Sequence, residues 1–144
     1  AAELILPQPA EADPSGEEMG LICFNSTASL AADRAYQRTI PADDDFFPSP
    51  SDFVYTLPNI VTGEIAIRHH IQGETAFYVL RAFNPETICH IVRETIADAD
   101  LHRAFVGWID IDTDRLDARA VLCVDRPHGN SPELTPEALL QLFP

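Results

Sequence analysis

The sequence has few basic residues, little cysteine and no long hydrophobic run, and each shortage excludes a class of protein. Nine basic residues face 23 acidic ones among 144, so the formal charge is −14. This charge repels phosphate backbones and anionic lipid headgroups. No apolar run approaches the roughly 18–20 residues that a membrane-spanning helix needs. We therefore expect neither nucleic acid nor a membrane as a partner.

The cysteines are too sparse to form a disulfide framework. Cys23, Cys89 and Cys123 lie far apart, and no two of them form a CxxC pair. The first residues also lack the basic and apolar regions of a signal peptide. We expect a cytoplasmic protein whose thiols pack as small apolar groups, because buried thiols are poor nucleophiles. The chain begins with Ala1, so processing, trimming and origin in a longer chain all stay open.

Familiar catalytic and metal-binding motifs are also missing. The sequence has no glycine-rich phosphate loop, no GxSxG elbow and no HExxH motif. The run 110–114 begins like a calcium loop, but Arg115 and Val121 replace the glycine and the glutamate that such a loop requires. His69 and His70 point about 100° apart on a helix and cannot bind one metal by themselves. We predict no metal, no cofactor and a solvated acidic turn between two strands.

What the sequence does contain is an alternation of short apolar runs and helical segments. It predicts strands at 19–24, 75–80, 104–110 and 118–124, the last two as a hairpin. It predicts helices over 30–38, 58–70, 85–97 and 136–143, and a loop shaped by prolines over 46–52. This order predicts one α/β domain over 1–144, with a mixed sheet and helices packed on it.

The predicted helix over 58–70 has several marked positions. Thr56 and Asn59 are candidate caps at its start, and Gly73 is the expected C-cap. Gly63, in the interior, costs about 1 kcal/mol relative to alanine, so we expect another backbone to pack closely against it. Glu64 is expected as a carboxylate on the helix surface.

Residues 47–79 resemble a known protein family. The segments FPSPSDFVYTLPN (47–59), GEIAI (63–67) and GETAFYV (73–79) are similar to the N-terminal region of the β-ketoacyl synthases, condensing enzymes of the thiolase fold. The resemblance extends over about 19–124 and implies a thiolase-like half domain, with 1–18 and 125–144 peripheral. The positions that match the family pattern, which we interpret as architectural, are Pro58, Asn59, Gly63, Glu64 and Gly73.

The family's catalytic cysteine would follow the strand over 75–80, where this chain has the segment Leu80 to Asn84. Cys89 comes too late to match, and the family's two histidines belong to a C-terminal half beyond this sequence. The resemblance thus implies a truncated protein with no catalytic residue. We expect an accessory or structural subunit in fatty-acid, polyketide or aryl-polyene-type biosynthesis. Its dimer strand, in a homodimer or heterodimer, would carry Thr75, Phe77 and Val79.

Two other functions stay open. The chain could be a fragment or subunit of an active β-ketoacyl-ACP synthase, an acyltransferase whose nucleophile and histidines lie elsewhere. It could instead be a module that binds an acyl carrier protein. Such carriers are acidic, so that module would need a basic patch despite the charge of −14. The arginines available for it are Arg68, Arg81, Arg93 and Arg103. The expected partner is a ketosynthase or an acyl carrier protein.

Overall fold

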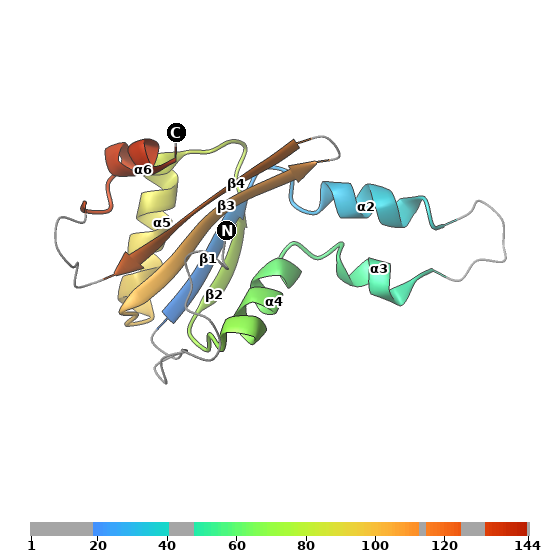
Figure 1. Ribbon diagram of the computed structural model, residues 1–144, viewed down its shortest axis with the longest axis horizontal. Helices are drawn as coiled ribbons and strands as arrows, with labels where there is room; N and C mark the ends of the chain where they lie inside the picture. Colours follow the sequence, from blue (N-terminus) through green and yellow to red (C-terminus); the bar gives the residue numbers. More distant parts are fainter. Residues whose placement is uncertain (1–18, 41–47, 113–114, 125–131, 144) are drawn as a thin grey trace.

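The computed structural model describes residues 19–40, 48–112, 115–124 and 132–143, which build a four-stranded sheet with helices on both faces (Figure 1). The spatial order of the strands is β2-β1-β3-β4. β1 is parallel to β2 and β3, and β3 is antiparallel to β4. The predicted mixed sheet and its hairpin are confirmed. The strands are β1 (Met19–Asn25), β2 (Thr75–Val79), β3 (Arg103–Asp112) and β4 (Arg115–Val124).

β1 forms the centre of the sheet, and all of its residues are buried. Side chains alternate between the two faces of a strand, so β1 contributes to two separate hydrophobic clusters. Ile22 and Phe24 pack with α5 (Pro85–Asp98) and α6 (Pro136–Leu142). Leu21 and Cys23 pack on the opposite face, which is covered by α4 (Ile60–His69). An apolar run of this kind is typical of a strand that is covered on both faces.

α5 and α6 begin where the sequence predicts. The side chain of Asn84 accepts a hydrogen bond from the backbone N–H of Thr87 at 2.8 Å, and Pro85 occupies the first turn. Thr135 caps α6 in the same way. Proline in the first turn costs no hydrogen bond, because the first N–H groups of a helix have no partner within it.

α4 is shorter than predicted at both ends. The predicted start at Pro58 is wrong, because the helix begins at Ile60, and Asn59 caps it without a side-chain hydrogen bond. The backbone carbonyl of Asn59 instead accepts from Thr62 Oγ1 at 2.7 Å. The predicted C-cap at Gly73 is also wrong. His70 ends the helix in the left-handed conformation, with φ of 55°.

Gly63 has no close neighbour, contrary to the expectation of a nearby backbone. A Cβ added there would meet no atom within 4 Å. We therefore predict that Gly63→Ala raises the free energy of unfolding by about 0.5–1 kcal/mol, because alanine restricts the unfolded chain and favours the helix. Urea unfolding measures the change. Gly20→Ala is the contrasting variant, since its Cβ would lie 2.6 Å from Leu101 Cδ1, and it should not stabilise.

The predicted proline loop contains a short helix. α3 (Pro50–Val54) starts after Ser49, whose hydroxyl accepts a hydrogen bond from the backbone N–H of Asp52 at 3.3 Å. The prolines at 48 and 50 suggested a loop, but a proline after a serine cap is also a favourable helix start. α3 lies beside α2 (Leu30–Gln37) at one end of the sheet (Figure 1). Within the described ranges, no helix is long and apolar enough to cross a membrane.

Candidate functional site

A cavity of about 280 Å³ lies where β1 and β3 end, between the sheet, α2 and α4. Ligands of open α/β sheets commonly bind at the carboxyl ends of parallel strands. Three of the residues predicted from the sequence, Pro58, Glu64 and Phe77, line the cavity together. Most of its other lining residues are apolar, and the polar ones are Asn25, Ser29 and Tyr55.

The wall of the cavity is fixed by the turn after β1. The side chain of Asn25 donates to the carbonyl of Ala28 at 2.7 Å and accepts from its N–H at 3.0 Å. These bonds hold Ala28 at a positive φ of 51°. Ser29 Oγ then donates to the carbonyl of Thr56 at 2.6 Å. The turn is thereby tied to the segment between α3 and α4, which forms the other side of the cavity.

One charged group faces the cavity. Glu64 lies on α4 and lines the cavity together with Tyr55. Its carboxylate, as a hydrogen-bond acceptor and as a negative charge, raises the pKa of Tyr55 above its ordinary value. The cavity thus combines apolar walls with a single carboxylate. A lone carboxylate is a poor metal site. Among the described residues, no group of three His, Cys, Asp or Glu side chains could hold a metal ion.

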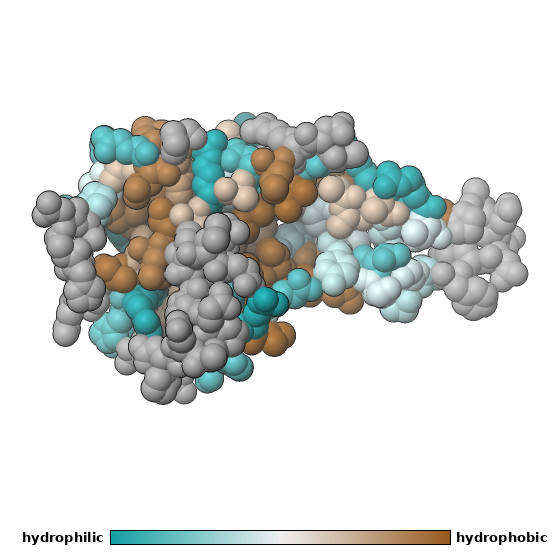
Figure 2. Space-filling model, in the orientation of Figure 1, coloured by the Kyte–Doolittle hydropathy of each residue, from teal (hydrophilic) through white to brown (hydrophobic). Residues whose placement is uncertain are grey.

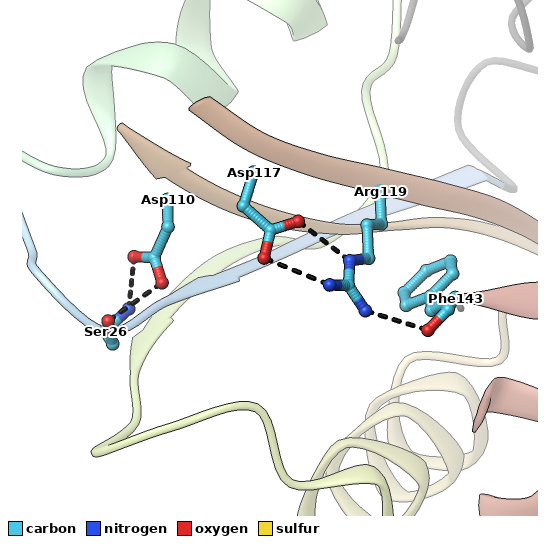
Figure 3. Close-up of polar contacts among 5 residues, drawn as sticks. All are labelled: Ser26, Asp110, Asp117, Arg119 and Phe143. Carbon is cyan, nitrogen blue, oxygen red and sulfur yellow. Dashed lines mark hydrogen bonds and ion pairs between the residues drawn. The ribbon is translucent and has the colours of Figure 1, made fainter. Parts of the chain in front are cut away.

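Asp110 is buried, so the predicted solvated turn is wrong at this residue. Asp110 is 8% exposed. Its carboxylate accepts hydrogen bonds from the backbone N–H and the hydroxyl of Ser26, both at 2.8 Å (Figure 3). Thr27 Oγ1 donates to it at 3.4 Å. The predicted strand ended at residue 110, but β3 continues to Asp112. Asp114 lies outside the described residues.

The place that the resemblance assigns to a nucleophile is the turn between β2 and α5. A hollow of about 250 Å³ is lined there by residues 80–84 and Thr87, none of which is a cysteine. Phe83 packs edge-on against Trp108, with ring centroids 5.4 Å apart. The guanidinium of Arg119 lies 5.6 Å from the centroid of the Phe83 ring. The turn is therefore held by an aromatic cluster rather than by polar groups suited to acyl transfer.

The three thiols lie on or near the sheet, and burial is the main cause of a raised pKa in each. Burial raises the pKa of Cys23 to about 12 and that of Cys123 to about 11, the latter with a contribution from the charge of Cys89. The pKa of Cys89, inside α5, is also raised, chiefly by burial. A thiolate is the reactive form of cysteine, so none of these groups is activated.

We predict that the thiols of the folded protein resist alkylation. At about pH 8, iodoacetamide should modify the native protein at least about a hundredfold more slowly than the urea-unfolded chain, because few thiolates form below the raised pKa values. Mass spectrometry of timed samples measures the rates. Rapid modification of Cys89 in the native state would contradict this expectation and would show an accessible nucleophile.

We also predict that stability falls at alkaline pH. The folded-state pKa of Cys23 exceeds the ordinary value of 9.0, so the unfolded chain loses this proton first. The contribution of this thiol to the free energy of unfolding is complete below about pH 9. It is lost as the pH rises further, at about 1.4 kcal/mol per pH unit. The chain contains no lysine, so no lysine side chain titrates in this pH range and obscures the effect of the thiol. Urea unfolding at several pH values measures the slope, and Cys23→Ala should reduce it.

The other predicted residues lie apart from the cavity or along one strand. Asn59 and Gly63 are in the first turn region of α4, and Gly73 precedes β2. Thr75, Phe77 and Val79 share one side of β2 by strand alternation, and β2 forms an edge of the sheet. Sequence analysis missed Asn25, Ser29 and Tyr55 as lining residues. The cluster Asn25-Ser-Thr after a buried strand was the available signal.

The arginines considered for carrier binding do not form one patch. Arg68 belongs to α4 and Arg93 to α5, and these helices cover opposite faces of the sheet (Figure 1). The guanidinium of Arg93 donates to the carbonyl of Leu134, next to α6. Arg68 and Arg93 therefore do not combine into a basic patch that could offset the negative charge of the whole chain.

Comparison with known proteins supports the fold. No protein-family model and no curated protein matches the sequence. Among solved structures, the chain is similar to one chain of the complex of the ketosynthase ApeO with its chain length factor ApeC from Xenorhabdus doucetiae. The TM-score is 0.51 at 11% sequence identity, and the match covers 78% of this chain and 49% of that chain. The predicted thiolase-like α/β fold is confirmed, and the chain spans about half the length of the structure it matches.

Proposed function

We propose that this protein is a non-catalytic, ketosynthase-like accessory subunit that acts in the cytoplasm beside a ketosynthase. The observation that carries the proposal is its likeness to a chain of a complex in which a ketosynthase is joined by a chain length factor. The proposed setting is the synthesis of fatty acids, polyketides or aryl-polyene-type products. Residues 1–144 act as one ketosynthase-like domain in this proposal.

The turn between β2 and α5 supports the absence of catalysis. Nucleophilic acyl transfer needs an activated thiol or hydroxyl with a base in reach. Residues 80–84 supply neither, and Phe83 fills the turn with an aromatic ring. Cys89 follows one turn later inside α5, where it is buried and its pKa is raised. The family-pattern positions Asn59, Gly63 and Gly73 then have an architectural role.

The free edge of β2 supports pairing with a second subunit. β2 pairs only with β1 among the described strands, so its other side presents backbone groups that another strand can use. Val79 is 52% exposed on this edge, and Phe77 beside it is partly buried. We propose that a strand of the partner, from a ketosynthase or from a second copy of this chain, pairs along Thr75–Val79.

An affinity purification from the native cells tests the proposal. The tagged chain is recovered at moderate salt, and co-purifying proteins are identified and quantified by mass spectrometry. We expect a ketosynthase at near-equal amounts, and we expect Val79→Glu to lose it. Leu140→Glu, on α6, is the matched control, because Leu140 is 53% exposed and the change adds the same charge.

Other results would count against the accessory role. Recovery of the chain without any ketosynthase overturns it. Recovery of an acyl carrier protein alone favours the carrier-binding module, and condensing activity of a purified pair that persists when the partner's own nucleophile is removed favours the enzyme. Loss of the ketosynthase with both glutamate variants would show that charge, rather than the β2 edge, governs the association.

A further inference from the structure

The hairpin of β3 and β4 presents an apolar face on the side of α4. Residues opposite one another in an antiparallel pair share a face, so Ile109 pairs with Ala118 and Ile111 with Leu116. Leu116 is 71% exposed and Ile111 is 53% exposed. We call this surface the hairpin face, and its residues are Ile109, Ile111, Leu116, Ala118, Ala120 and Leu122.

Among the described side chains, no charged one lies between the residues of the hairpin face, and Arg103, on the same side of β3, lies beyond it opposite Val124. The charged residues of β4 that are described, Asp117 and Arg119, alternate with it and therefore point to the side of α5 and α6. Surface strands normally alternate apolar and polar residues, with the polar ones toward water. β4 reverses that arrangement, since its polar residues face the aromatic cluster around Phe83. Exposed apolar surface of this extent is typical of an interaction site.

The hairpin face is also hollowed. Its floor consists of small residues, Ala118 and Ala120, with Gly107 opposite Ala120. Larger side chains, including Phe105, Ile109 and Leu116, surround the floor, and α4 closes one side. The resulting hollow measures about 600 Å³. A floor of small residues between large ones accepts bulky apolar side chains of a partner, as knobs fit into holes.

The hollow lies beside α4, over β3 and β4. Among the described helices, α4 packs mainly on β1 and β2 and α2 contacts β3, so none of them packs extensively on β4. On the opposite face, two helices, α5 and α6, lie next to each other. Figure 2 shows hydrophobic side chains at the surface over the sheet in this view, whereas paler and hydrophilic ones prevail over α2 and α3. An added helix beside α4 would complete the layer.

We propose that the hairpin face binds an amphipathic helix of a protein partner, with basic residues on the polar side of that helix. The apolar side of the helix would cover the small-residue floor, and its polar side would face a molecule with a charge of −14. Glu64 and Arg68 of α4 both border the hollow, so the preference for a basic helix rests on the net charge of the whole chain. A second copy of the chain is disfavoured as the occupant because it carries the same net charge. The hairpin face lies at the opposite edge of the sheet from β2. An experiment can therefore overturn helix binding at the hairpin face without affecting the proposed subunit pairing along β2.

A labelled model peptide tests this proposal. The probe is a Leu/Lys helix of about 18 residues, about 27 Å long, with leucine along one face. Fluorescence anisotropy at about 0.15 M salt measures its affinity. We expect Leu116→Glu to weaken binding about tenfold or more, and Leu140→Glu, which adds the same charge on α6, to change it by less than about twofold. Ala118→Glu is the second variant for the same face.

Backbone amide shifts locate the peptide and distinguish the other occupants. We expect perturbed resonances in 105–111 and 116–122, and weak binding of a matching Leu/Glu peptide. Equal losses in both glutamate variants, or shifts spread over the whole surface, would reduce the effect to general charge attraction and overturn the proposal. A dimer in sedimentation that Leu116→Glu abolishes would assign the face to a second copy. Tighter peptide binding by Ile5→Glu would assign it to the chain's own N-terminal segment, and either result overturns a partner helix.

Discussion

Replacing Asp110 by alanine is expected to lower the free energy of unfolding by about 2–4 kcal/mol. The carboxylate of Asp110 accepts two bonds of 2.8 Å from Ser26 and lies in a residue only 8% exposed. Alanine would leave the N–H and the hydroxyl of Ser26 without their acceptor in a partly buried turn. Hydrogen bonds to a charged acceptor are stronger than neutral ones, which places the expected loss well above that of an ordinary surface change. Urea unfolding followed by the fluorescence of the single tryptophan, Trp108, measures it.

Asp112→Ala is the matched control. Asp112 lies two residues along the same strand, but its side chain is 47% exposed, and its ion pair with Arg34 spans 3.6 Å. Exposed pairs of this kind contribute less than about 1 kcal/mol. Asp110→Asn should fall between the two, because an amide keeps one acceptor and loses the charge. Equal stability of the two alanine variants would mean that the Asp110 contacts do not stabilise the turn after β1.

Arg119→Ala is expected to cost about 2–4 kcal/mol and to loosen α6. Arg119 binds Asp117 through two bonds of 2.8 and 3.2 Å, and its Nη1 donates to the carbonyl of Phe143 at 2.8 Å (Figure 3). The same guanidinium lies over the ring of Phe83. One side chain thus joins β4, the turn before α5 and the end of α6. Its loss also leaves the carboxylate of Asp117, which is 17% exposed, without this partner.

Hydrogen exchange separates this local role from a general loss of stability. In Arg119→Ala, amides of 136–142 should exchange faster than the loss of global stability explains. The exchange rates of β1 amides should change only as much as the free energy of unfolding changes. Arg119→Lys keeps the charge but not the two-pronged geometry, so it should recover only part of the loss. Arg34→Ala, at a side chain that is 56% exposed, is the control. Unchanged exchange in α6 would contradict the role assigned to the Phe143 bond.

Local signals in the sequence predicted some elements well, because short segments determine them. Asn84-Pro85 and Thr135-Pro136 start helices through a side-chain cap and a proline that lacks an N–H, and both starts are confirmed. The same chemistry at Ser49-Pro50 was missed, because Pro48 nearby favoured a loop. The predicted end of α4 at residue 70 was close, but its C-cap was misplaced at Gly73, because His70 adopts the left-handed conformation in which glycine is the usual residue.

Long-range contacts were beyond local patterns. Asp110 looked solvated beside other acids, yet its hydrogen-bond donors come from Ser26 and Thr27, far away in the chain. The cavity assembled Pro58, Glu64 and Phe77, which the sequence singled out for a family resemblance rather than for a shared site. Spacing along a chain indicates which face of a helix or strand a residue occupies, but not which distant element covers that face.

The central position of β1 has a consequence for the order in which the protein folds. β1 is synthesised first among the described strands, yet Leu21 pairs with Thr75 on one side and with Phe105 on the other. Its buried backbone groups therefore have no strand partners until the ribosome has made β2 and β3. Pairing across such separations requires closing long loops, which slows folding. We expect a nascent chain that ends before Arg103 to remain protease-sensitive throughout β1, and protection to arise only once the β3–β4 hairpin has been released from the ribosome.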